Sequence, residues 1–177
     1  MTKNKDRIYI MLHARGGPGY HWALTRSPKR EDPNSTDETA RYHARNFPLP
    51  GGGRGQWEYD RGSMGAIPTN NALVRILIGK LKPSMRNQME DVLAKVVVIQ
   101  GNPQWNCRTW LRTAIEELMN AGIIHRKWDW EELESKALWY VQKKEKEGRF
   151  RAVDAGGTFD GTVIPTYDLL RNCETRK

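Results

Sequence analysis

The sequence predicts an α+β protein, in which an antiparallel sheet from the N-terminal half packs against helices from the C-terminal half. Up to about residue 80, short β-branched and aromatic runs are separated by Gly- and Pro-rich breaks. From Ser84 onward the apolar residues recur at helical spacing. Strands followed by helices is the order of an α+β fold. At 177 residues without an internal repeat, the chain has the size of a single domain, with a core over about 7–150 and an extended tail over 151–177.

Five segments are predicted as strands: residues 7–13, 20–25, 39–45, 56–59 and 73–80. Gly16-Gly17-Pro18-Gly19 separates the first two, which are expected to form a hairpin. Residues 27–38 are predicted to be a polar loop. Because side chains alternate along a strand, His21 and Ala23 share one face of the second strand and Trp22 lies on the other.

Three amphipathic helices are predicted, over about residues 84–97, 106–120 and 129–147. Ser84 and Asp129 are candidate N-caps, with Glu132 as the capping-box partner of Asp129. Gly122 stands where a helix C-terminal glycine belongs. The middle helix has the clearest apolar stripe: Trp110, Leu111, Ala114, Ile115, Leu118 and Met119.

The formal charge of +8 is spread along the chain, apart from a net +6 over residues 1–30. No arginine-rich tract or basic helix is present, so nucleic-acid binding is not the favoured function, and an anionic substrate explains the charge equally well. Two cysteines cannot build a disulfide framework, which favours a reducing, cytoplasmic location. No apolar run is long enough to span a membrane.

Cys107 is the most informative residue for chemistry. It begins the predicted middle helix, where unpaired N–H groups and the helix dipole favour a thiolate and can hold an oxyanion. A thiol nucleophile also needs a base, and His21 and His43 both lie on predicted strands. The alternative is that Cys107 is a buried small hydrophobe.

The remaining candidates are less specific. A zinc site of His21, His43 and Cys107 is conceivable, but no close ligand pair supports it, so neither a metal nor a cofactor is predicted. His13 is expected at the surface or in a turn, and Cys173 is expected to be an inert exposed thiol.

Two short motifs carry a resemblance to a known superfamily. Tyr20-His21-Trp22-Ala23-Leu24, followed much later by Asn106-Cys107 at a helix start, resembles the circularly permuted papain-like enzymes, which include lecithin:retinol acyltransferase and the H-rev-type phospholipase/acyltransferases. The resemblance covers roughly residues 7–122. It implies that His21 is the general base, His43 the residue that orients it and Cys107 the nucleophile.

The sequence departs from that superfamily after the cysteine. Arg108-Thr109-Trp110 replaces an acidic residue, His and Phe, and the hydrophobic C-terminal membrane anchor is absent, so a phospholipid substrate is not implied. The pattern is also similar to small soluble fungal proteins without an assigned activity.

Four tryptophans lie close to these motifs in sequence: Trp22, Trp57, Trp105 and Trp110. They are candidates for an aromatic-lined substrate pocket, with ordinary core packing as the alternative. Asn106 is a candidate oxyanion donor or a plain N-cap.

The favoured hypothesis is a thiol-dependent hydrolase or acyltransferase acting on an ester, thioester or amide. Cys107 attacks the carbonyl, His21 takes and returns the proton, and His43 sets the imidazole tautomer. This geometry requires both imidazoles to face the N-terminal end of the Cys107 helix, and it predicts an acidic thiol. The rivals are a non-catalytic binding module with an aromatic cleft and a basic nucleic-acid-binding protein. Oligomeric state is left open.

Overall fold

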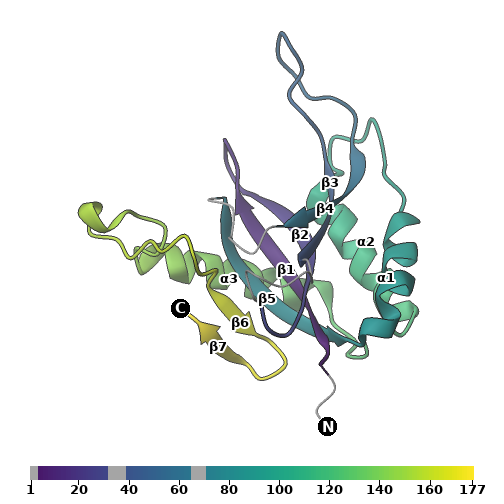
Figure 1. Cartoon of the computed structure of the whole chain (residues 1–177). Helices are drawn as coiled ribbons and strands as arrows, with labels where there is room; N and C mark the ends of the chain where they lie inside the picture. The colour runs from purple at the N-terminus through teal and green to yellow at the C-terminus, as the bar shows by residue number, and fades with distance from the viewer. Residues whose placement is uncertain (1–3, 32–38, 65–70) are drawn as a thin grey trace.

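A computed structural model describes residues 4–31, 39–64 and 71–177 (Figure 1). It contains a seven-stranded sheet with the order β4-β3-β2-β1-β5-β6-β7. The strands are β1 (Asp6–Ala14), β2 (Tyr20–Ser27), β3 (Thr39–Arg45), β4 (Glu58–Met64), β5 (Ala72–Leu81), β6 (Thr166–Asp168) and β7 (Cys173–Arg176). With three α-helices beside this sheet, the predicted α+β class is confirmed.

The first five strands agree closely with the sequence prediction. β1 and β2 form the expected antiparallel hairpin, in which His13 lies opposite His21. Gly19 in its turn has φ 82°, a left-handed conformation that favours glycine. The polar loop predicted over 27–38 begins later, because Ser27 still belongs to β2, and its residues 32–38 lie outside the described part of the chain.

The C-terminal segment differs from the predicted extended tail. β6 pairs with β5 in parallel and β7 pairs with β6, so this segment adds two strands to the sheet, which is therefore not purely antiparallel. The physical reason is burial: Tyr167 and Leu169 are 7% and 5% exposed and join the main core. Figure 1 shows β6 and β7 beside β5, and the pairing involves Arg75–Leu77 in the middle of that strand.

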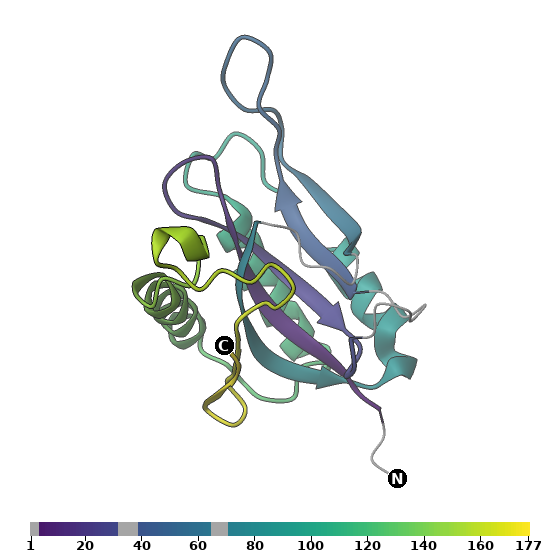
Figure 2. The same cartoon turned by 60° about the vertical axis from the view of Figure 1, so that its left-hand side comes forward.

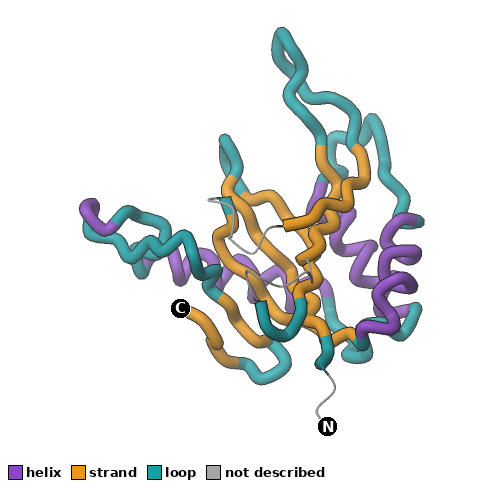
Figure 3. Tube along the Cα trace, viewed as in Figure 1, coloured by secondary structure: helices purple, strands orange, loops and turns teal. Residues whose placement is uncertain are grey.

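The helices are α1 (Arg86–Ala94), α2 (Cys107–Asn120) and α3 (Trp130–Lys146), with short 3₁₀ turns at Pro83–Met85 and Val153–Ala155 (Figure 3). α2 and α3 begin and end close to their predicted limits. The first predicted helix is shorter, because its first residues form the 3₁₀ turn and Ser84 makes no capping hydrogen bond.

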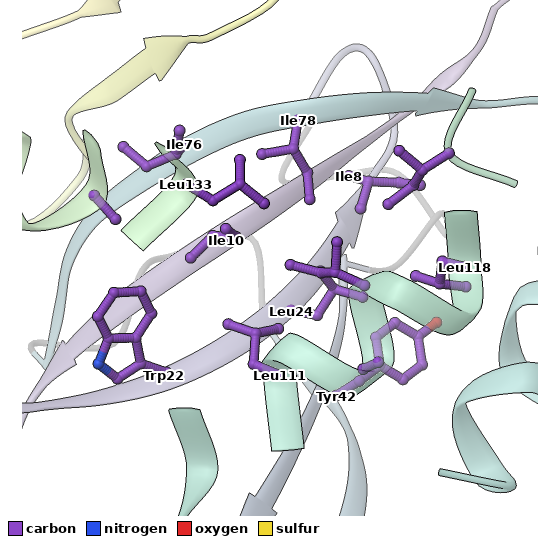
Figure 4. Close-up of a cluster of buried hydrophobic side chains, with 14 of the residues drawn as sticks. Ile8, Ile10, Trp22, Leu24, Tyr42, Ile76, Ile78, Leu111, Leu118 and Leu133 are labelled. Atoms are coloured by element: carbon purple, nitrogen blue, oxygen red, sulfur yellow. The ribbon is translucent and has the colours of Figure 1, made fainter. Parts of the chain in front are cut away.

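One face of the sheet carries the hydrophobic core, and all three helices pack on it. Every second residue of the central strands points into this core, as Figure 4 shows for Ile8, Ile10, Trp22, Leu24, Tyr42, Ile76 and Ile78. The helices contribute Leu111 and Leu118 from α2 and Leu133 from α3. By the same alternation, the intervening residues lie on the opposite face. That second face contains a small apolar cluster of Met11, Met64 and Ile164, and a row of histidines.

The connection between β3 and β4 projects beyond the sheet (Figures 1 and 2). Its base is fixed to the α1–α2 connection by two hydrogen bonds between the main chain of Trp57 and the side chain of Gln100, at 2.9 and 2.7 Å. Trp57 also contacts Trp105 edge to face, with ring centroids 5.4 Å apart. This contact holds the segment that leads into α2.

Candidate functional site

Two histidines and an aspartate form a hydrogen-bonded chain across β2, β3 and β4. Nε2 of His21 lies 2.5 Å from Nδ1 of His43, and Nε2 of His43 lies 3.0 Å from an Asp60 carboxylate oxygen. His43 and Asp60 are directly opposed in the β3–β4 register, so the sheet itself places them in contact. The same carboxylate is 3.1 Å from the guanidinium of Arg45. The structure therefore brings the two predicted histidines together and adds Asp60.

The hydrogen bonds assign the protons in this chain. The Asp60 carboxylate can only accept, so Nε2 of His43 donates to it and Nδ1 of His43 is the acceptor. Nε2 of His21 then donates to Nδ1 of His43, which leaves Nδ1 of His21 unprotonated. Burial lowers the pKa of His21 to about 3 and the pKa of His43 to about 4, although the Asp60 hydrogen bond acts in the opposite direction on His43. Both rings are neutral at pH 7.

Cys107 is the first residue of α2 and is 2% exposed. Burial raises the pKa of the Cys107 thiol, and this effect outweighs the backbone N–H groups of Trp22 and Arg108 and the charge of Arg15, which all lower it. The prediction of an acidic thiol is therefore wrong for this structure. The backbone N–H groups beside the sulfur are nevertheless of the kind that binds an oxyanion.

The thiol and the imidazoles approach the same stretch of β2 from different sides. Trp22 points into the core together with Cys107, whereas His21 and His43 alternate to the opposite face. In the described residues, no hydrogen bond joins the Cys107 sulfur to either ring. The expectation that both rings face the N-terminal end of α2 is thus not met, because strand alternation assigns Trp22 and His21 to opposite faces.

An open pocket of about 230 Å³ adjoins the thiol. Its lining residues are Arg15, Gly19, Tyr20, Trp22, Asn106, Cys107, Arg108 and Leu138. Of the four predicted tryptophans, Trp22 alone lines it. Trp110 is fully buried and packs on Tyr59, and Trp57 pairs with Trp105 at the base of the β3–β4 connection. The four rings do not form one pocket, since helical and strand periodicity point them in different directions.

Asn106 is the N-cap of α2. Its side-chain oxygen accepts from the backbone N–H of Arg108 at 2.9 Å and of Thr109 at 3.4 Å. The Thr109 hydroxyl accepts from the Asn106 N–H in return, which completes a capping box. Asn106 was predicted to be either an oxyanion donor or an N-cap, and these contacts support its role as an N-cap.

Two polar residues on the histidine face, His13 and Asp60, were not predicted from the sequence to belong to the site. His13 was expected at the surface, yet it is 4% exposed, and its ring centroid lies 6.0 Å from that of His21. The predicted β1–β2 hairpin could have indicated this, because its register places His13 opposite His21. Asp60 lies one residue beyond the predicted fourth strand, and the sequence offered no register to pair it with His43. Cys173 is exposed, as predicted.

Within residues 4–31, 39–64 and 71–177, no cluster of three His, Cys, Asp or Glu side chains is arranged to hold a metal ion. In the same ranges, no helix has both the length and the apolar character needed to cross a membrane.

Comparison with known proteins identifies a family of unknown function. No curated protein and no solved structure matches the chain. One family model, described as a family of unknown function (DUF6914), matches residues 5–176, which include all seven strands and all three α-helices, and the chain therefore belongs to this family.

Proposed function

We propose that this protein catalyses thiol-dependent acyl transfer or hydrolysis, with Cys107 as the nucleophile and His21 as the general base. The observation that carries the proposal is the chain from Asp60 through His43 to His21. It holds one imidazole in a defined tautomer, and within the described residues nothing hydrogen-bonds to Nδ1 of His21. A neutral imidazole with an oriented, unoccupied nitrogen is what general-base catalysis requires.

The surroundings of Cys107 supply the other parts. The sulfur of Cys107 lies beside the backbone N–H of Trp22. Trp22 directly follows His21 on β2, so the thiol is next to the strand segment that carries the base. Its raised pKa means that the thiol needs a base at neutral pH. His21 alternates to the face of β2 opposite Cys107, so the mechanism requires its ring to turn around the start of β2 toward the sulfur when a substrate binds, and this movement is part of the proposal.

The reaction proceeds in two steps. Sγ of Cys107 forms a bond to the acyl carbon while Nδ1 of His21 takes the thiol proton, and the C–O, C–S or C–N bond to the leaving group breaks as His21 returns that proton to it. Water or another nucleophile then attacks the thioester, passes its proton to His21, and releases the acyl group with the free thiol. The backbone N–H groups at the start of α2 stabilise the oxyanion in both steps.

A second candidate follows from the missing hydrogen bond between Cys107 and His21. His21 can activate a water molecule directly, in which case ester hydrolysis proceeds on the histidine face without a covalent intermediate. This mechanism uses the same Asp60–His43–His21 chain but not the thiol.

Acylation by p-nitrophenyl acetate separates the two mechanisms. With the native protein, we expect a burst of p-nitrophenolate and an acetyl adduct on Cys107, located by peptide mass spectrometry. Cys107→Ser should abolish both, and His21→Ala should slow acylation by about 100-fold or more, because a positioned general base contributes roughly 10²–10⁴. His43→Asn should have a smaller effect, since an amide oxygen still accepts from His21.

Cys173→Ser is the matched control, because that thiol is exposed and distant from α2 in sequence. Melting temperatures of all variants show whether each protein is folded. Turnover that persists in a folded Cys107→Ser protein and disappears in His21→Ala would favour water activation. A folded native protein that releases no p-nitrophenolate above buffer would refute both mechanisms and favour a binding module.

A further inference from the structure

The charged side chains that line the Cys107 pocket are all positive. They are Arg15 and Arg108, and the other lining residues are neutral. Arg108 is already neutralised by Glu134, with 2.7 Å between guanidinium and carboxylate. Arg15 follows β1 directly and is exposed, and no acidic side chain of the described residues pairs with it. The pocket thus contains one uncompensated guanidinium.

The charge of Arg15 reaches both groups that would react. It lowers the pKa of the Cys107 thiol and also the pKa of His21. Arg15 lines the same pocket as the Cys107 sulfur, and it follows Ala14, which pairs with Tyr20 next to His21 in the hairpin. A ligand group bound by Arg15 would therefore lie next to the reacting carbonyl.

We propose that the pocket selects an acyl donor with a small anionic group near its reacting carbonyl, and that Arg15 binds this group. The inference rests on the proposed function and names its substrate class. A guanidinium binds carboxylate and phosphate oxygens through a planar pair of N–H donors, which gives orientation as well as attraction.

The rates at which Cys107 reacts with iodoacetate and iodoacetamide test this proposal without any need for turnover. The two reagents form the same C–S bond and expel iodide, but only iodoacetate carries a carboxylate. The loss of the Arg15 charge raises the thiol pKa and slows both reagents equally, so the test is the ratio of the two rates. We expect Arg15→Gln to slow the iodoacetate reaction about threefold to fivefold more than the iodoacetamide reaction, the range of a solvent-exposed ion pair. Cys173 serves as an internal reference in each protein.

Lys146→Gln is the matched variant, since it removes one positive charge from an exposed position on α3 that does not line the pocket. It should leave both rates unchanged. Acetate and inorganic phosphate are then added as competitors: protection of Cys107 from iodoacetate by acetate identifies a carboxylate-bearing donor, and protection by phosphate a phosphorylated one. Protection by neither overturns the proposal.

Equal effects of Arg15→Gln on the two reagents, or an equal effect of Lys146→Gln, would also overturn it. These outcomes are distinct from failure of the proposed function. A protein that shows the iodoacetate preference but no acylation by p-nitrophenyl acetate has an anion site without the catalysis. A protein that is acylated but lacks the preference has the catalysis with a different substrate class.

Discussion

Three histidine rings share one face of the sheet, and His13 is the one without a hydrogen-bond partner on Nε2 among the described residues. Burial lowers the pKa of His13 to about 4 from 6.5, with a further contribution from Arg41. When the pH falls below 6.5 the unfolded chain takes up a proton that the folded protein refuses until about pH 4. The free energy of unfolding therefore falls progressively as the pH drops from about 6.5 to about 4 because of His13, and His13 has no such effect above pH 6.5.

The substitution His13→Leu tests this account. We expect the free energy of unfolding at pH 7 to be unchanged or slightly higher, because a buried polar atom without a partner is removed. Between pH 7 and pH 5 the variant should lose less stability than the native protein, as measured by urea denaturation. His125→Gln, at an exposed histidine, should follow the native curve. A His13→Leu protein that is strongly destabilised at pH 7 would show instead that the ring makes a necessary interaction.

At the scale of elements, α2 depends on its first turn. The Asn106 side chain satisfies two of the N–H groups that a helix N-terminus leaves unpaired, directly beside the Cys107 thiol. An element that holds a nucleophile needs this end to be fixed, because fraying of the first turn would move both the sulfur and the oxyanion donors.

Asn106→Ala should reduce the free energy of unfolding by about 1 kcal/mol, the usual cost of losing an N-cap. Asn106→Ser keeps a capping oxygen but removes the amide N–H₂, so it should restore most of that stability. Urea denaturation and the p-nitrophenyl acetate burst are measured on both. If Asn106→Ser is as stable as the native protein but loses the burst, the amide is an oxyanion donor rather than only a cap.

At the scale of the whole molecule, the C-terminal strands complete the fold. β6 covers the edge of β5, and Thr166 on β6 accepts a 2.8 Å hydrogen bond from the buried Arg75. Tyr140 of α3 donates to Glu174 on β7 at 2.8 Å, so a helix and the final strand are joined as well. The C-terminal strands β6 and β7 thus extend the sheet beyond β5 and join it to α3.

Deletion of residues 165–177 should therefore destabilise the protein by roughly 5 kcal/mol or more. Tyr167 and Leu169 are lost from the core at a few kcal/mol each, and β5 becomes an unpaired edge. This is comparable to the whole stability of a typical domain, and circular dichroism should show an unfolded or aggregated chain at 25 °C. Deletion of the exposed Lys177 alone should have no effect. A long deletion that melts like the native protein would mean that the tail is dispensable.

The sequence by itself determined the α+β class, the five N-terminal strands and the helices that begin at Cys107 and near Asp129. These features follow from local signals: alternation over 20–25, an apolar stripe over 110–119, and caps at Asn106 and Asp129, each read within a few residues. The pairing of His21 with His43 was expected only from the resemblance to the permuted papain-like enzymes, which implies that His43 orients His21. By contrast, residues 166–176 looked like a tail because a three-residue strand has no periodicity of its own.

Only the tertiary structure decided how the chemical groups meet. Asp60 contacts His43 through the register between two strands, which a long projecting connection leaves unspecified in the sequence. Burial decided the protonation of Cys107 and of the three histidines, because the pKa of each follows from the side chains packed around it. The proximity of Arg15 to the thiol likewise arises where the β1–β2 turn meets the start of α2, two segments about ninety residues apart. Distances of this kind are set by packing, and no local pattern encodes them.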